Sequence, residues 1–356
     1  MATSPYRYKS IASPDTIRLI HIHPSPNVEA EIECSLAHVT LKACAQDITE
    51  HYVALSYVWG DASLERAISI GGQSLAITAS LHCALSYLRD ETRVIRVWAD
   101  GVCIDQKSNE DRSFQVAMMG SIYSIATHTV IFLGEPTPEL ELTMELLESR
   151  LSGNEQVPIS DEEQLVHLIQ DNILTRPWFS RVWILQELVL SVSPWVQGAK
   201  FPVKWDTFSS YVCASDSASW SPNSRNLLIG MSRTRRDFNK KIQSLQDNSE
   251  APSGDSFAEL FQILESRRGS AASDPRDMVY AHLGLISPFT RDMIDVHYNK
   301  SIAELYEEIA RRHIAKYGDT AILSYVEELD PCDRRDGLPS WVPDIRDNFP
   351  MYFTKI

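Results

Sequence analysis

The chain has 356 residues, of which 44% are hydrophobic and 23% charged, and its formal net charge is −15 at pH 7. This length predicts two domains, or one domain with a large appendage, and enough apolar residues for a sizeable core. No run of about 18 apolar residues occurs, so we expect no membrane span, and the first ten residues do not resemble a secretory signal peptide. The acidic balance argues against a general nucleic-acid-binding protein, which needs a basic surface.

The cysteines are scattered and form no CxxC pair, which is typical of reduced, mostly buried thiols and favours a cytoplasmic protein. They are Cys34, Cys44, Cys83, Cys103, Cys213 and Cys332. His21 and His23 share one face of an expected strand, but two histidines without a third ligand are only a weak indication of a metal. We therefore predict no metal site.

The N-terminal part is predicted to be rich in strands. Residues 16–23 (TIRLIHIH) alternate apolar with polar or basic side chains, and residues 31–37 and 38–42 are further short candidates. Residues 51–57 (HYVALSY) form an apolar run that a Gly-Asp turn ends, as expected for a buried strand. We expect a hairpin over residues 68–77, because Gly71 and Gly72 can supply the positive φ of a tight turn.

Helices and strands then alternate. We expect a helix from Ser80 to about residue 89, then a strand over residues 94–99. A capping box of Ser108 and Asp111 opens the next expected helix, and a strand over residues 129–133 follows it. This alternation indicates an α/β fold class, with a parallel sheet flanked by helices.

The remainder is predicted to be mostly helical, apart from two short strands within residues 195–205. The helix candidates cover residues 138–150, 161–173, 176–190, 208–216, 232–245, 256–267, 276–285 and 302–317, and residues 248–255 are a polar loop. We divide the chain into β-rich additions (1–50), an α/β core (51–205) and a mostly helical region (206–356). It ends soon after residues 338–345, which is compatible with a fragment of a longer protein.

Two expected strands end in residues that are suited to binding, since open parallel sheets bind ligands at the carboxyl ends of their strands. The first end supplies Ser56, Tyr57, Trp59, Gly60 and Asp61, which offer a hydroxyl, flat rings for stacking, a sharp turn and an acid. An ordinary turn with packed aromatic side chains is the alternative.

The second strand end, residues 100–106, holds Asp100 and Asp105, which could bind a metal or substrate hydroxyls but are more often turn formers. Cys103 lacks a nearby histidine that would make it a nucleophile.

The third candidate is the expected helix over residues 176–190. Trp183 and Glu187 are one turn apart and would share a face, with Ser180 on the same side. A carboxylate beside an indole in a partly buried site could accept hydrogen bonds from sugar hydroxyls or stabilise a developing cation. The alternative is a core tryptophan and a salt-bridged glutamate.

Several blocks together resemble the fungal heterokaryon-incompatibility (HET) domain. They cover residues 52–61, 97–112, 116–134 and 176–188, with the downstream segments 274–285 and 338–345, and the departures at Ala99, Gly101 and His282 are small. The resemblance implies a fungal, cytoplasmic effector of allorecognition that triggers death of fused cells of unlike genotype. It also implies a protein partner from an incompatible strain.

A more distant resemblance links SYVWGD at residues 56–61 and SRVWILQELV at residues 180–189 to Toll/interleukin-1 receptor (TIR) domains. It implies a TIR-like parallel sheet, self-assembly on activation, and cleavage of NAD between nicotinamide and ribose with Glu187 as the catalytic residue. NAD would be the substrate and not a cofactor, and Ser180, Trp183, Asp100 and the residues of the first strand end would bind it. A carboxylate can stabilise the oxocarbenium-like ribose that departing nicotinamide leaves behind.

Two other functions stay open. In a non-catalytic signalling module that acts by self-assembly and partner recruitment, Trp59, Trp98 and Trp183 would be core residues. Glu187 would then be a buried ion-pair partner of Arg181 or Arg112. A metal-dependent hydrolase would use Asp100 and Asp105, although the sequence shows no carboxylate-rich metal spacing.

Overall fold

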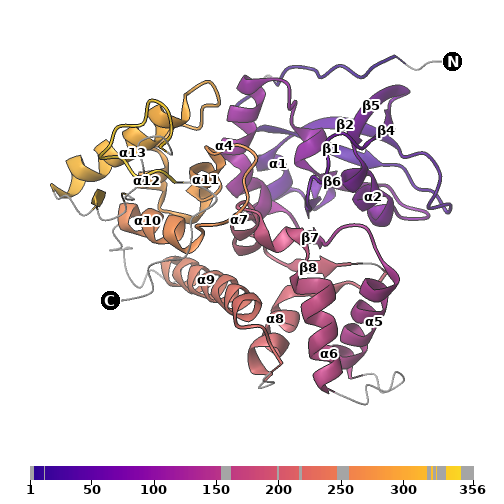
Figure 1. Cartoon of the computed structure of the whole chain (residues 1–356). Coiled ribbons are helices and arrows are strands. Elements are labelled where there is room, and N and C mark those ends of the chain that lie inside the picture. Colours follow the sequence, from indigo (N-terminus) through magenta and orange to yellow (C-terminus); the bar gives the residue numbers. More distant parts are fainter. Residues whose placement is uncertain are drawn as a thin grey trace.

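The computed structural model describes residues 4–11, 13–153, 162–198, 200–215, 219–246, 256–318, 322–323, 326 and 334–345. Its centre is a nine-stranded sheet in the order β5-β4-β2-β1-β6-β3-β7-β8-β9 (Figure 1). The strands are β1 (Thr16–Ile22), β2 (Glu33–Thr40), β3 (Val53–Ser56), β4 (Glu65–Ile70), β5 (Gln73–Thr78), β6 (Ile95–Trp98), β7 (His128–Phe132), β8 (Pro194–Gln197) and β9 (Val203–Lys204).

The sheet is mixed, which corrects the expectation of a parallel sheet. Its centre is parallel, since β3 pairs with β6 and β7, and β7 pairs with β8 in the same direction. Antiparallel pairs extend it on both sides, with β1 between β2 and β6 and β9 beside β8. β1 is buried along almost its whole length, because every apolar residue in it is covered on one face or the other. The predicted N-terminal β segments therefore lie within the central sheet.

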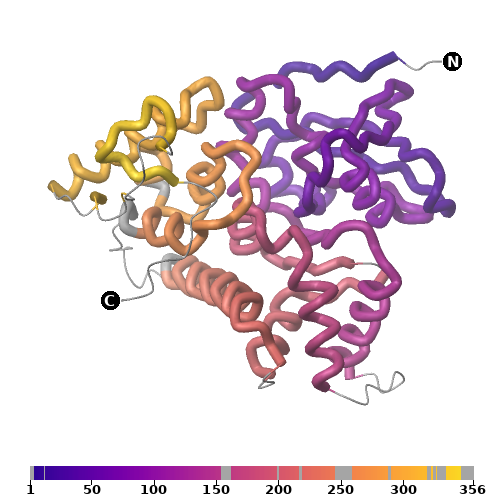
Figure 2. Tube along the Cα trace, in the orientation of Figure 1, coloured from indigo at the N-terminus to yellow at the C-terminus, as the bar shows by residue number. Residues whose placement is uncertain are grey.

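The helices surround this sheet and extend into a large C-terminal part (Figure 2). They are α1 (Leu41–Gln46), α2 (Ala79–Leu88), α3 (Asp100–Cys103), α4 (Asn109–Ile125), α5 (Pro138–Ser152), α6 (Glu162–Ile169), α7 (Ile184–Val189), α8 (Trp205–Ala214), α9 (Pro222–Gln246), α10 (Ser256–Ser266), α11 (Asp277–Tyr280), α12 (Pro288–Arg291) and α13 (Ile302–Tyr317). None of the described helices is both long and apolar enough to cross a membrane.

Local signals in the sequence explain several elements as predicted. The β4–β5 hairpin turns at Gly71 and Gly72, which have φ of 57° and 81°. A complete capping box of Ser301 and Glu304 opens α13, and Gly318 with φ of 64° closes it. At α4 only half of the expected box forms. Ser108 accepts from the Asp111 N–H, whereas the Asp111 carboxylate pairs with Arg18.

Other elements differ from the prediction. Residues 33–40 form one strand instead of two short ones, and α1 follows it directly because Thr40 caps that helix. The region expected as a helix over residues 276–285 divides into α11 and a 3₁₀ turn, Leu283–Leu285. The polar loop at residues 248–255 and Cys332 lie outside the described residues.

The largest correction concerns the helix expected over residues 176–190. The chain forms a 3₁₀ turn at Pro177–Ser180, is extended at Arg181, and begins α7 only at Ile184. The extended backbone pairs with the distant segment at Ala271, because the Val182 N–H donates to the Ala271 carbonyl at 3.0 Å. Tertiary pairing therefore interrupts the local helical pattern, and Ser180 does not lie on the helix that carries Glu187.

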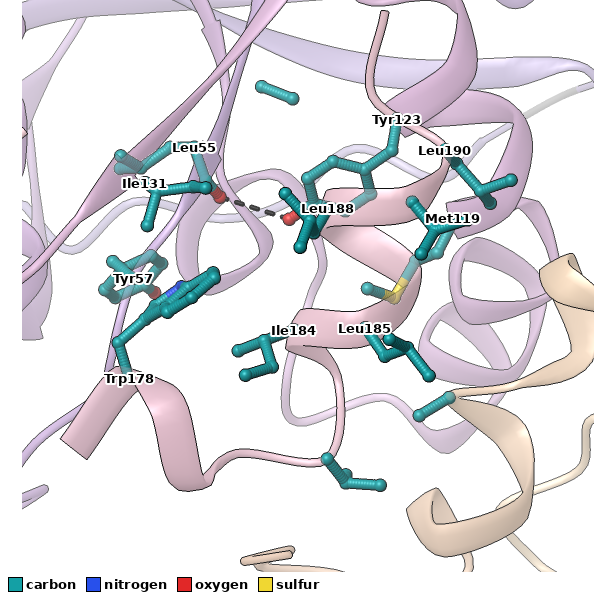
Figure 3. Packing of buried hydrophobic residues seen from close by; sticks show 14 of the residues in the cluster. Leu55, Tyr57, Met119, Tyr123, Ile131, Trp178, Ile184, Leu185, Leu188 and Leu190 are labelled. Atoms are coloured by element: carbon teal, nitrogen blue, oxygen red, sulfur yellow. Dashed lines mark hydrogen bonds between the residues drawn. The ribbon is translucent and has the colours of Figure 1, made fainter. Parts of the chain in front are cut away.

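The core runs without a break from the sheet to α7. Trp98, Trp178 and Trp205 are fully buried, and the rings of Trp178 and Trp205 lie 5.9 Å apart. Figure 3 shows Ile184, Leu185 and Leu188 of α7 between Trp178 on one side and Met119 and Tyr123 of α4 on the other. This packing holds α7 against the carboxyl end of β3.

Candidate functional site

Ser56 and Glu187 meet inside the protein. Ser56 is the last residue of β3, and its hydroxyl donates to Oε2 of Glu187 on α7. The same hydroxyl accepts from the Trp178 indole N–H at 2.7 Å. Glu187 is only 2% exposed, and Ser56 and Trp178 are buried as well. The structure thus joins the first predicted strand end to the predicted glutamate, within the core.

Arg181 completes this cluster. Its Nη1 lies 3.7 Å from Oε2 of Glu187, and the same nitrogen donates to the carbonyl of Tyr57. The Arg181 side chain is 15% exposed, so it separates the carboxylate from solvent. Burial raises the pKa of Glu187, while the Arg181 guanidinium and the Ser56 hydroxyl oppose that shift. The ion pair with Arg181 agrees with the non-catalytic alternative, which named Arg181 as a partner of Glu187.

A second group forms next to the cluster, where β3 and β6 end. The Trp59 indole N–H donates to Oδ2 of Asp100 at 2.9 Å. Tyr57 is buried, and burial together with the charge of Asp100 raises its pKa. A Cβ at Gly101 would lie 2.6 Å from the Tyr57 hydroxyl, so this close approach requires glycine. Trp59 is 37% exposed and is therefore not the core residue that the non-catalytic alternative expected.

Gly60 and Asp61 shape the turn beyond Trp59. Gly60 has φ of 72°, a conformation that favours glycine. The exposed Asp61 carboxylate accepts from the backbone N–H and the hydroxyl of Ser63 at 2.8 and 2.7 Å. Asp61 therefore has a turn-forming role in this structure.

Trp183 and Ser180 have other partners than Glu187. The Trp183 indole N–H donates to Asp277 of α11 at 3.2 Å. The Ser180 hydroxyl donates to the Pro177 carbonyl at 2.8 Å and lies at the surface. The backbone break at Arg181 is the reason, because it turns Ser180 away from the face expected for a continuous helix.

The C-terminal part holds the segment that carries Arg181. The Ala271 N–H donates to the Ser180 carbonyl at 2.7 Å, and Arg267 donates to the Arg181 carbonyl at 2.8 Å. Further along, the Gly284 N–H donates to Oε1 of Gln186 at 2.8 Å, and a Cβ at Gly284 would approach that oxygen to 2.6 Å. Sequence patterns did not indicate the roles of Arg267, Gln186, Gly284 or Trp178, since each contact joins distant parts of the chain.

The metal-hydrolase alternative gains no support from its residues. Asp100 accepts from Trp59, and Asp105 accepts from the Lys107 N–H as a turn former. Within the described part of the chain, no group of three or more His, Cys, Asp or Glu side chains could hold a metal. Cys103 is fully buried, and burial raises its pKa to about 12, which disfavours the nucleophilic thiolate.

A cavity of about 500 Å³ lies away from this cluster. It is formed by the N-terminal arm and the start of α4, with Tyr8, Arg18 and Asp111 among its lining residues. Among the candidate residues, Asp105 lines this cavity, whereas Ser56, Arg181 and Glu187 do not.

The geometry defines an α/β domain in which a buried polar cluster joins the end of β3 to α7. Comparison with known protein families shows which family this domain resembles. Residues 52–187, from the residue before β3 to Glu187, match the family model of heterokaryon incompatibility protein (HET). The chain therefore resembles the HET family over this stretch. It is similar to heterokaryon incompatibility protein 6, OR allele, of Neurospora crassa, with 28% identity over 236 residues.

That alignment covers 52% of this chain and 34% of the relative, so the chain spans about a third of the relative's length. No solved structure gives a significant match. The likeness to TIR domains therefore stays a prediction.

Proposed function

We propose that the chain acts in heterokaryon incompatibility as a signalling module, by self-assembly and by recruitment of a protein partner from an incompatible strain. Its resemblance to the HET family and its similarity to an incompatibility protein of Neurospora crassa support the biological role. The role of Glu187 in this proposal is structural: it joins α7 to the end of β3.

The observation that carries this proposal is the enclosure of Glu187. The carboxylate is 2% exposed, and its hydrogen-bond and ion-pair partners Ser56 and Arg181 are groups of the protein itself. A substrate would have to displace both partners from the carboxylate. Its own polar groups would then lose their hydration, which costs free energy. An unpaired carboxylate inside a protein is strongly unfavourable, so the contacts with Ser56 and Arg181 stabilise the buried position of Glu187.

The test is cell death in a fungal host that expresses the chain together with an incompatible partner. We expect Glu187→Gln to retain death at equal protein abundance, with cellular NAD unchanged, because glutamine keeps the shape and can accept from Ser56. Glu110→Gln, an exposed carboxylate on α4, is the matched control. The proposal would be contradicted if Glu187→Gln, but not Glu110→Gln, abolished cell death at normal protein abundance. In that case NAD would also be consumed in cells with the wild type but not in cells with Glu187→Gln.

A second candidate, cleavage of NAD, is favoured by one observation. Glu187 lies at the carboxyl ends of β3 and β6, beside the half-exposed pair of Trp59 and Asp100, where parallel sheets bind ligands. In this reaction the bond between C1′ of the ribose and the nicotinamide nitrogen breaks. Water adds at C1′, nicotinamide leaves with the bonding electrons, and one proton is released. Arg181 would first have to withdraw from the carboxylate.

A further inference from the structure

Charge is unevenly distributed over the surface of this acidic chain. Helix α9 carries Arg225, Arg233, Arg235, Arg236, Lys240 and Lys241 against a single acid, Asp237. Arg235 is buried and pairs with Asp206 at 3.1 Å, and the partly exposed Lys241 pairs with Glu259 at 2.8 Å. Arg233, Arg236 and Lys240 are exposed and form no ion pair with any described residue. Their spacing of three and four residues places them on one face of the helix, which the exposed Asp237 shares, and we name the three cations the basic stripe.

Helix α5 carries the opposite pattern, which we name the acidic stripe. Glu141 and Glu145 are exposed and Glu148 is half-buried, and their spacing of four and three residues also defines one face. Among the residues that the structure describes, these three glutamates form no ion pair. Arg150, the nearest cation on the helix, pairs with Glu162 of α6 at 3.0 Å.

The two stripes match in spacing and lie on different helices of one molecule. When two helices run antiparallel, steps of three then four residues on α9 align with the same steps read backwards along α5. Lys240 then faces Glu141, Arg236 faces Glu145 and Arg233 faces Glu148. Both helices pack against α8, and Figure 1 shows α8 between them, so the helices that carry the two stripes are separate elements of the fold.

We propose that the basic stripe of α9 docks on the acidic stripe of α5 of a second copy of this chain. Because the contact joins two different surfaces, every open assembly leaves one basic and one acidic stripe free at its two ends, and further copies can add there head to tail. Exposed ion pairs are individually weak and are screened by salt. Assembly is therefore expected to need high protein concentration and to fall as ionic strength rises.

This inference deepens the proposed function, on which it rests for its biological meaning, by naming a second copy of the chain as the assembly partner. Its test measures association of the purified chain in solution, so its outcome is read separately from any cell-death result.

The experiment is sedimentation velocity over a range of protein concentrations, at low ionic strength and near 1 M salt, where the Debye length is about 3 Å. One variant reverses the basic stripe (R233E/R236E/K240E), a second reverses the acidic stripe (E141K/E145K/E148K), and a third combines both. K42E/R66E/K107E, at exposed cations elsewhere, has the same change in net charge as the first variant and serves as the control.

We expect the wild type and the control to associate at low salt and to dissociate at high salt. Each single-stripe variant should stay monomeric, whereas their equimolar mixture and the combined variant should associate again. A wild type that is monomeric under every condition overturns the proposal. So does equal loss of association in the control, or association that persists unchanged in the basic-stripe variant.

Discussion

At the scale of single residues, the cluster around Glu187 gathers groups from three parts of the chain. Ser56 comes from a strand end, Trp178 and Arg181 from the irregular segment before α7, and Glu187 from α7 itself. Each polar group of the cluster finds a partner in this arrangement, which buried polar groups require. The stability of the cluster is therefore cooperative, and its members should not contribute independently.

We expect Arg181→Ala to lower the free energy of unfolding by about 3–5 kcal/mol, since it leaves the Glu187 carboxylate buried and unpaired. Glu187→Gln should cost less, because Arg181 is partly exposed and still donates to the Tyr57 carbonyl. The double variant should recover part of the loss caused by Arg181→Ala. Urea unfolding of all four proteins measures this cycle, and additive effects would show that the two residues do not interact.

At the scale of elements, α7 and α11 are linked through Asp277. Its carboxylate accepts from the Trp183 indole and from the Tyr298 hydroxyl, the latter at 2.6 Å. Burial raises the pKa of Asp277 to about 6, while the hydrogen bonds from Tyr298 and Trp183 act in the opposite direction. An acid whose pKa is raised in the folded state destabilises the fold when it ionises.

Ionisation of Asp277 should therefore weaken the fold as pH rises from about 4, the usual pKa of aspartate, through about 6. We expect Asp277→Asn, which can hydrogen-bond to both partners, to gain up to about 3 kcal/mol on the wild type between pH 4 and pH 7. Thermal and urea unfolding across this pH range measure the difference.

Asp274→Asn is the matched control, because its effect on the free energy of unfolding should change with pH in the opposite direction. Asp274 pairs with Arg276 at 2.7 Å and with Arg112 at 3.5 Å, and the Arg276 hydrogen bonds hold its pKa below the usual range in spite of burial. The stability that it contributes is present above pH 4 and is lost as pH falls below it. If the difference in free energy of unfolding between Asp277→Asn and the wild type did not change with pH, the raised pKa of Asp277 would be refuted.

The elements also show which features a sequence can reveal. The β4–β5 hairpin and the ends of α13 depend on glycines and caps within a few residues, so their patterns are local and the structure confirms them. The break at Arg181 depends on pairing with Ala271, and the partners of Trp183 and Gln186 lie at Asp277 and Gly284. Helical spacing could place Trp183 and Glu187 one turn apart, but it could not show that their side chains have different partners.

At the scale of the whole molecule, the C-terminal helices hold the segment that carries Arg181. Hydrogen bonds from Arg267, Ala271 and Gly284 fix the segment from Ser180 to Gln186, and so fix the position of Arg181 over Glu187. The α5 and α9 stripes lie at the surface, whereas the Glu187 cluster is enclosed. Signalling by assembly needs those surfaces and does not need an open site.

The most direct test of this account is release of nicotinamide from NAD by the purified chain. It is measured at low ionic strength and high protein concentration, where the chain is expected to assemble, and again after dispersal in salt. We expect the wild type and Glu187→Gln to give the same result under both conditions, with no release above the protein-free control. Release by the assembled wild type that is lost in an equally folded Glu187→Gln would contradict the structural role of Glu187 and establish the catalytic one.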